Sequence, residues 1–154
     1  MRSFFSLVAL VLSLTAFSQQ TSSYTAKLPA GYKIADVNNK ETRFESDLDK
    51  DGIMDLAVIL SKKDDNSAIL AIFLSSNFKK DKSYQRLQWF HMINDFEVKN
   101  NILTVDGTDM GKYLTEIKMK YDPVSKKMKI TSGTQSGLEG HDKKLKLKLS
   151  DAKL

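Results

Sequence analysis

Apolar side chains recur at every second position over most of the chain after residue 31, which predicts β-strands rather than helices. The clearest case is residues 113–121, where Tyr, Thr, Ile, Met and Tyr alternate with Leu, Glu and Lys. Residues 53–60 and 68–74 are instead nearly continuous apolar runs, which is typical of strands buried on both faces. We expect these two runs to form a hairpin at the heart of the core.

Shorter alternating stretches, separated by turn residues, complete the pattern. The further strands we expect lie at 32–37, 41–46, 84–92, 96–99, 102–105, 127–131 and 144–149. Turns are expected at Asn100-Asn101 and at 106–111, and a Gly-rich loop at 132–142. No segment predicts a long helix. The sequence therefore predicts an all-β fold, an antiparallel meander that forms a small sandwich, barrel or propeller-like sheet.

A cluster of aspartates precedes the first apolar run, at positions 1, 3, 5 and 9 of residues 47–55. These aspartates are Asp47, Asp49, Asp51 and Asp55. Carboxylates at alternate positions of a tight loop can turn toward one centre and supply the hard oxygen ligands that Ca²⁺ prefers. Gly52 at position 6 permits a positive φ, and the Ile53 carbonyl at position 7 would be a further ligand. The other interpretation is a solvated, Asp-rich turn without a metal.

The spacing of this loop distinguishes between calcium motifs. An EF-hand places a Glu at position 12, where this chain has Val58. The loop instead resembles the DxDxDGxxD loop of FG-GAP and VCBS-type repeats, found in integrin-type propellers and in many secreted bacterial proteins. The resemblance covers roughly residues 44–60 and a single copy of the loop. It implies a loop between two antiparallel strands, with Ca²⁺ held by the four aspartates.

The N-terminus predicts export. Residues 1–18 combine Arg2, an apolar stretch and a small-residue cleavage site at Ala16-Phe17-Ser18, the order of a signal peptide. Residues 19–31 are then a tail and entry turn, and residues 32–154 a single β domain. The chain has no cysteine, so neither a lipid-attachment cysteine nor a disulfide is expected. We predict a periplasmic or extracellular protein with no stable membrane anchor after cleavage.

Charge is unevenly distributed along this chain of formal net charge +5. Residues 41–65 carry eight acidic and four basic groups, whereas residues 112–154 carry eleven lysines and five acidic groups. Lys144, Lys146 and Lys148 alternate with leucines, which places them on one face of the expected last strand. They form either a solvated face or a contact for an acidic partner. Without an aromatic-basic motif, nucleic-acid binding is not expected.

Catalysis has little support in the sequence. The chain has no cysteine and only two histidines, His91 and His141, in separate segments. These do not form a zinc signature or a nucleophile–base pair. The acidic cluster is better explained by a metal than by the paired carboxylates of glycoside hydrolysis. We therefore expect a protein that is not an enzyme.

The interpretation that best fits these features is an exported calcium-binding β domain that acts as a binding module for an envelope protein or polysaccharide. A second, weaker resemblance is to periplasmic lysozyme-inhibitor and immunity-type β-proteins, which present a Ser-Gly-x-x-Tyr loop to the hydrolase. Ser132-Gly133 and Ser136-Gly137 supply the first half of that motif, although no Tyr follows either pair. An inhibitor of a lysozyme-like cell-wall hydrolase is therefore the alternative.

Overall fold

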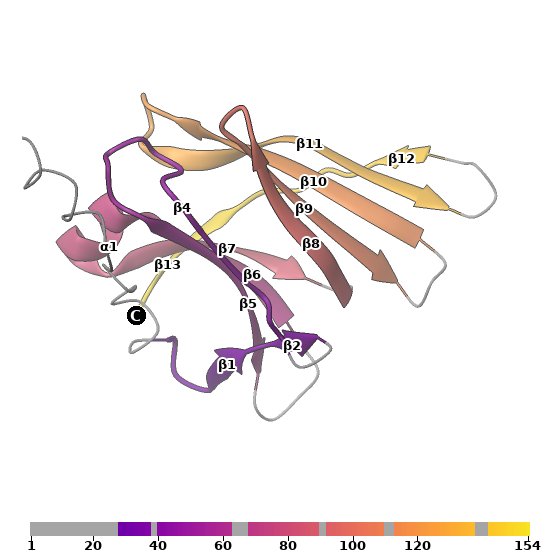
Figure 1. The fold of residues 1–154 in the computed structure, drawn as a ribbon, viewed down its shortest axis with the longest axis horizontal. Helices are drawn as coiled ribbons and strands as arrows, with labels where there is room; N and C mark the ends of the chain where they lie inside the picture. Colours follow the sequence, from indigo (N-terminus) through magenta and orange to yellow (C-terminus); the bar gives the residue numbers. More distant parts are fainter. Residues whose placement is uncertain (1–27, 38–39, 63–67, 90–91, 110–112, 138–141) are drawn as a thin grey trace, which may run out of the picture.

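The computed structural model describes residues 28–37, 40–62, 68–89, 92–109, 113–137 and 142–154. Two antiparallel sheets lie against each other as two layers (Figure 1), and they do not close into a barrel. The predicted all-β fold is confirmed, and of the three expected forms the structure has the sandwich. The predicted signal peptide, residues 1–18, lies outside the described residues. In the part of the chain that is described, no helix has the length and apolarity needed to span a bilayer.

The first sheet has the strand order β1-β5-β6-β7-β13, and β4 also pairs with β5. Its strands are β1 (Tyr32–Ile34), β4 (Arg43–Ser46), β5 (Asp55–Lys62), β6 (Ala68–Phe73), β7 (Ser83–Trp89) and β13 (Ser150–Lys153). A small separate ribbon is formed by β2 (Asp36–Val37) and β3 (Lys40–Glu41). One short helix, α1 (Ser75–Asp81), follows β6. The sequence analysis did not predict this helix.

The second sheet has the order β12-β11-β10-β9-β8. Its strands are β8 (Met92–Lys99), β9 (Ile102–Asp109), β10 (Tyr113–Asp122), β11 (Lys127–Gly137) and β12 (Asp142–Lys144). The predicted two-residue turn between β8 and β9 is confirmed, because Asn100 and Asn101 both have positive φ, 53° and 61°. Such a turn matches the twist of the strands that it joins.

The hairpin of β5 and β6 is central, as its two apolar runs predicted. These strands pair in register from Leu56 with Phe73 to Ser61 with Ala68. One face of the hairpin packs into the core between the sheets, and the other packs under Phe78 of α1. Nearly every side chain of β5 and β6 is therefore buried, which explains why their sequences lack alternation.

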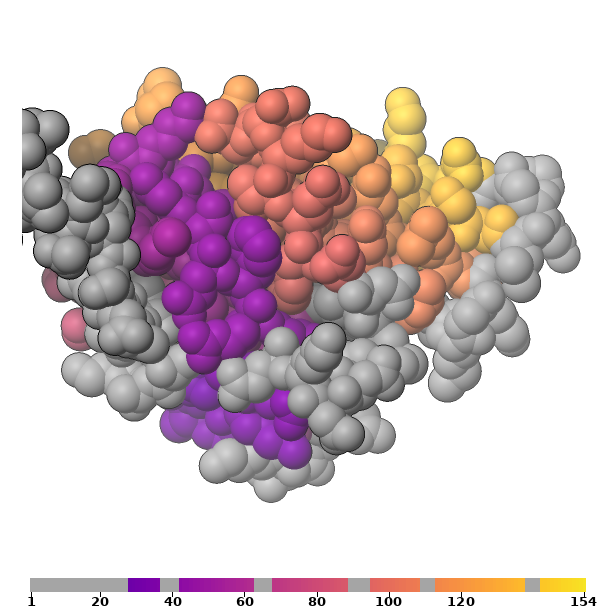
Figure 2. All heavy atoms as spheres, viewed as in Figure 1, coloured from indigo at the N-terminus to yellow at the C-terminus, as the bar shows by residue number. Residues whose placement is uncertain are grey.

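The second sheet closes the core with alternate residues of β9, β10 and β11. These are Leu103, Val105, Ile117, Met119 and Met128, all at most 2% exposed. At one border of the sandwich β4 and β8 lie side by side (Figure 2), and the rings of Phe44 and Phe96 stack there at 6.4 Å. Between β7 and β11, the buried Gln85 side chain bonds the backbone N–H and C=O of Met128, at 2.7 and 3.0 Å. The Gln85 amide thus links the two sheets through a pair of hydrogen bonds like those that a neighbouring strand would make to the backbone of Met128.

The expectation of a Gly-rich loop at 132–142 is wrong for residues 132–137, which continue β11. Gly133 is buried and pairs with Ile117 of β10. A Cβ at Gly133 would lie 3.4 Å from atoms of Leu145 and Leu147, so the glycine permits a close approach of the C-terminal chain. Because residues 132–137 lack apolar alternation, their sequence did not indicate a strand. The strand forms through backbone pairing with its neighbour. Similarly, residues 106–109 extend β9 rather than starting a turn.

The expected last strand at 144–149 is not a continuous sheet strand. Residue 144, the first of this stretch, is the last residue of β12 in the second sheet. Residues 145–149, here called the crossing segment, then connect β12 to β13 in the first sheet (Figure 1). The predicted alternation itself is confirmed. Leu147 and Leu149 are half-buried against the core, whereas the lysines at 144, 146 and 148 are exposed.

Candidate metal centre

The aspartate cluster lies in the connection between β4 and β5. These strands are antiparallel, and Ser46 pairs with Asp55, so residues 47–55, here called the acidic loop, form a tight reversal. The prediction that the loop joins two antiparallel strands is confirmed. Gly52 has φ = +83°, a left-handed conformation that glycine takes without a Cβ penalty. Lys50 also has a positive φ, 63°.

Three of the predicted ligands converge in space. Asp47, Asp49 and Asp55 each offer one carboxylate oxygen, and these three oxygens all lie within 4.8 Å of one another. Two oxygens bound to one Ca²⁺ at about 2.3–2.6 Å lie at most about 4.6–5.2 Å apart. The three carboxylates are therefore close enough together to hold one metal ion. The residues present fit a divalent cation with oxygen ligands.

Backbone N–H groups of the loop itself hold two of these carboxylates. Asp47 accepts hydrogen bonds from the N–H of Asp51 at 3.1 Å and of Gly52 at 3.0 Å. Asp49 accepts a second bond from the Asp51 N–H at 3.2 Å. These contacts are local, between residues at most five positions apart. The backbone of the loop thus orients these carboxylates.

Asp55 is fully buried at the base of the loop. Its carboxylate accepts three backbone hydrogen bonds, from Leu48 at 2.7 Å, Asp49 at 3.2 Å and Ser75 at 2.7 Å. Burial nevertheless raises the pKa of Asp55 from 3.8 to about 7, and the charge of Asp49 adds to this rise. A buried carboxylate beside other carboxylates is stabilised by a bound cation.

The remaining two predicted ligands have other contacts. Asp51 is not part of the three-carboxylate group. Its oxygens accept bonds from the Ile53 N–H at 2.8 Å and from the Ser75 hydroxyl at 2.8 Å. Ile53 is half-buried in the loop, and the role of its carbonyl stays a prediction.

Sequence analysis missed two serines at the start of α1. The Ser75 N–H and hydroxyl bond Asp55 and Asp51, and the Ser76 hydroxyl donates to Asp49 at 2.9 Å. These serines lie twenty or more positions beyond the loop, and the β5–β6 hairpin brings them to it. A Ser-Ser pair directly after a buried strand was the available signal.

The negative potential of the loop reaches the second sheet. The pKa of Tyr121 on β10 is raised, first by burial and then by the charges of Asp49, Asp51 and Asp55. The pKa of Asp49 itself is raised, mainly by burial and also by its acidic neighbours. The loop thus lies where β5, α1 and β10 meet, and a cation there would neutralise repulsion at a junction of both layers.

The other sequence candidates are two histidines and two Ser-Gly pairs. His91 and His141 lie outside the described residues. Both Ser-Gly pairs of the inhibitor-type motif lie inside β11, paired with β10. Within the described residues they therefore do not form a protruding loop.

No family model, no curated protein and no solved structure matches this chain. The all-β sandwich and the grouping of Asp47, Asp49 and Asp55 are therefore what the structure itself establishes, and the resemblance to FG-GAP and VCBS-type repeats rests on the acidic loop.

Proposed function

We propose that this protein is an exported β-sandwich that binds one Ca²⁺ in the acidic loop and acts as a non-enzymatic binding module. In this proposal Asp47, Asp49 and Asp55 hold the ion, and Asp51 and the Ile53 carbonyl complete its shell. The ion stabilises the junction of the layers. The rest of the sandwich offers the surface that a partner recognises.

The observation that carries the calcium proposal is the convergence of the Asp47, Asp49 and Asp55 oxygens within 4.8 Å. Nothing but oxygen faces the centre from these residues, and the chain contains no cysteine. Such a donor set favours hard cations. Ca²⁺ is preferred over Mg²⁺ because a loop of crowded carboxylates suits a large, irregular shell, whereas Mg²⁺ requires near-ideal octahedral geometry.

Support for a structural rather than a catalytic role comes from the surroundings of the loop. The carboxylates bond the backbone of the loop and the start of α1. A bound ion would therefore connect the β4–β5 reversal to the element that follows β6. An exported chain without disulfides gains stability from such a connection.

Equilibrium dialysis against radioactive Ca²⁺ tests this proposal. We expect one ion per chain with a Kd of about 0.1–1 mM, the range of extracellular calcium modules. Asp49→Ala should abolish the binding. Asp142→Ala removes an exposed carboxylate of β12, outside the loop, and should leave it unchanged. If Asp49→Ala binds calcium as well as Asp142→Ala does, the calcium is not held in the acidic loop.

The binding-module part of the proposal has a separate test. The mature protein, immobilised with Ca²⁺, is exposed to purified envelope polysaccharides and to lysozyme-like hydrolases. Retention of a polysaccharide or of a non-hydrolase envelope protein supports the binding module. Inhibition of a hydrolase at stoichiometric concentration would favour the inhibitor alternative instead.

A further inference from the structure

Two adjoining hollows open between α1, β7, β13, the β10–β11 turn and the crossing segment. Their volumes are about 230 and 450 Å³, and both are lined by Gln85, Ser125, Lys127 and Asp151. We call the two together the lysine groove. The lysines that line it are Lys80, Lys126, Lys127, Lys129, Lys148 and Lys153.

The groove carries more positive charge than its own acidic residues balance. Among the described residues, the acidic side chains that line it are Asp81 and Asp151, and they pair with Lys153 and Lys127. A third lysine of the groove, Lys129, pairs with Asp122 outside it.

Three exposed groove lysines have no ion pair with any described residue. They are Lys80, Lys126 and Lys148. A concave surface with charge of one sign and low-dielectric walls concentrates the field and attracts an opposite charge.

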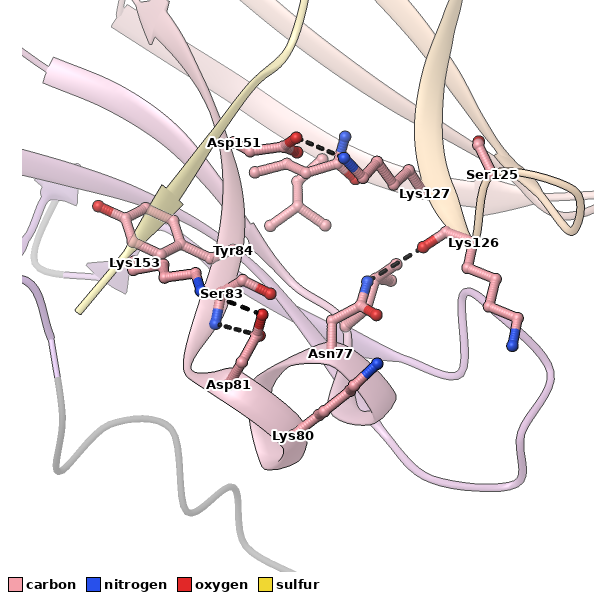
Figure 3. A pocket seen from close by; sticks show the side chains of 13 residues that line it. Asn77, Lys80, Asp81, Ser83, Tyr84, Ser125, Lys126, Lys127, Asp151 and Lys153 are labelled. Atoms are coloured by element: carbon pink, nitrogen blue, oxygen red, sulfur yellow. Dashed lines mark hydrogen bonds and ion pairs between the residues drawn. The ribbon is translucent and has the colours of Figure 1, made fainter.

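One wall of the groove is anchored rather than loose. The Asn77 side chain on α1 donates to the Lys126 carbonyl at 3.0 Å, across the mouth of the smaller hollow (Figure 3). Lys126 has φ = +54°, a conformation that fixes the direction of the turn. The Lys127–Asp151 ion pair, also drawn in Figure 3, ties β11 to β13. The β10–β11 turn, α1 and β13 are thus held in place around the opening of the lysine groove.

The edge of a strand also lines the groove. In the described residues β11 pairs with β12 over Thr134–Ser136, so residues 127–130 have β10 on one side and the groove on the other. At Met128 the outward N–H and C=O bond the Gln85 amide instead of a strand. By the alternation of an antiparallel ladder, the N–H and C=O of Ile130 point the same way. An extended peptide bonds such an edge through its own backbone.

The lining discriminates between a peptide and a sugar chain. Binding of a sugar ring usually uses an exposed aromatic face, because the ring presents an apolar side as well as polar hydroxyls. Of the described residues that line the groove, Tyr84 is the one aromatic, and it is 5% exposed and stacked on Phe73 at 4.9 Å. The groove offers lysines, which attract carboxylates, and a strand edge, which bonds a peptide backbone. Both features suit a polypeptide that carries carboxylates.

We propose that the lysine groove binds an extended acidic polypeptide segment of a partner protein. Its carboxylates lie against Lys80, Lys126 and Lys148, and its backbone lies along the edge of β11 near Ile130. The inference rests on the proposed role as a binding module, whose partner class it names, and it does not require the metal.

A fluorescein-labelled peptide of alternating Glu and Val is the probe, with its anisotropy measured on the mature protein at about 0.05 and 0.15 M salt. The groove variant is Lys80→Gln/Lys126→Gln/Lys148→Gln. The matched control, Lys33→Gln/Lys99→Gln/Lys143→Gln, removes the same charge from exposed lysines outside the groove. We expect binding to weaken about tenfold or more in the groove variant and less than about twofold in the control.

Equal weakening in both variants would overturn the proposal, because it would show general attraction of a polyanion to a cationic protein. Tighter binding of a uronic-acid oligosaccharide of equal charge, lost in the groove variant, would also overturn it in favour of a sugar site. Should the groove variant fail to fold, chemical-shift mapping on the unmutated protein decides. Shifts must then concentrate at Lys80 and at residues 126–130. All measurements are made with Ca²⁺ and with EDTA, so a failed calcium proposal leaves this outcome unaffected.

Discussion

In the acidic loop, four carboxylates come from nine consecutive residues, whereas the six lysines of the lysine groove come from α1, the β10–β11 turn, β11, the crossing segment and β13. The two charged regions share α1, which bonds the loop through Ser75 and Ser76 and lines the groove through Asn77 and Lys80. One region is thus built from local sequence and the other from the tertiary fold.

The charges are also held differently. In the loop, backbone N–H groups fix the carboxylates of Asp47, Asp49 and Asp55 at short range. In the groove, exposed lysines hold their charge on long, flexible stems. The loop is therefore suited to one small ion at a defined position, and the groove to an extended anion whose binding weakens with salt. A rigid site affects stability, whereas a flexible cationic surface affects association.

The largest expected effect separates the two regions by stability. Asp55→Ala leaves the N–H groups of Leu48, Asp49 and Ser75 without their acceptor in a buried setting, so we expect a loss of about 2–4 kcal/mol of unfolding free energy. Lys148→Gln in the groove should change it by less than about 0.5 kcal/mol. Urea unfolding measures both. A stability loss at Lys148 as large as that at Asp55 would break the contrast.

The pH dependence of the metal-free protein is the next effect. Burial raises the pKa of Asp55 from 3.8 to about 7, so the folded state binds its proton more tightly than the unfolded state does. The unfolding free energy should therefore fall as pH rises through the window from about 4 to about 7, by about 1–3 kcal/mol. Asp55→Asn should remove this fall, and Ca²⁺ should oppose it by stabilising the ionised carboxylate. Metal-free melts at pH 5 and pH 8 are the measurement, and an undiminished fall in the Asn variant would contradict the assignment.

Two glycines with nearly the same left-handed backbone conformation can distinguish the cost of backbone strain from a loss of metal binding. Gly52 and Gly31 have φ of +83° and +80°, and a Cβ would meet nothing within 4 Å at either. Alanine should cost about 1–2 kcal/mol at each, through the left-handed conformation alone. Only Gly52→Ala lies in the acidic loop, so only it should also weaken Ca²⁺ binding in dialysis. Equal weakening by Gly31→Ala would remove the loop from the explanation.

The smallest expected effect is spectroscopic. Burial and the charges of Asp49, Asp51 and Asp55 raise the pKa of Tyr121. Ca²⁺ in the loop should lower that pKa, because it neutralises the nearby carboxylates. The difference between the ultraviolet titrations of the unmutated protein and of Tyr121→Phe isolates this tyrosine. An unchanged titration on addition of Ca²⁺ would place the ion away from the loop.

The predictable features of this protein are the local ones. The turn at Asn100-Asn101, the β5–β6 hairpin and the positive φ of Gly52 depend on neighbouring residues, and the sequence predicted all three. The spacing of the four aspartates predicted that their side chains would group together, and three of the four do. The fourth, Asp51, accepts hydrogen bonds from the Ile53 N–H and from the Ser75 hydroxyl, which the fold brings from α1.

What the sequence did not predict depends on partners distant along the chain. Residues 132–137 form a strand because β10 pairs with them, although they lack apolar alternation. The leucines of the crossing segment alternate like a strand, but they connect two sheets instead of completing one. The lysine groove has no local signature at all, because its lysines meet only after both sheets have formed.

The most direct test of the central claim is calorimetric melting of the protein in EDTA, in 1 mM Ca²⁺ and in 1 mM Mg²⁺. With a Kd of about 0.1 mM, 1 mM Ca²⁺ adds about 1.4 kcal/mol to the unfolding free energy and should raise the Tm by a few degrees. Mg²⁺ should have little effect, and Asp49→Ala and Asp51→Ala should remove the calcium-dependent rise, whereas Asp142→Ala should retain it. Identical melting of the unmutated protein in EDTA and in Ca²⁺ would contradict the account of the acidic loop as a calcium site.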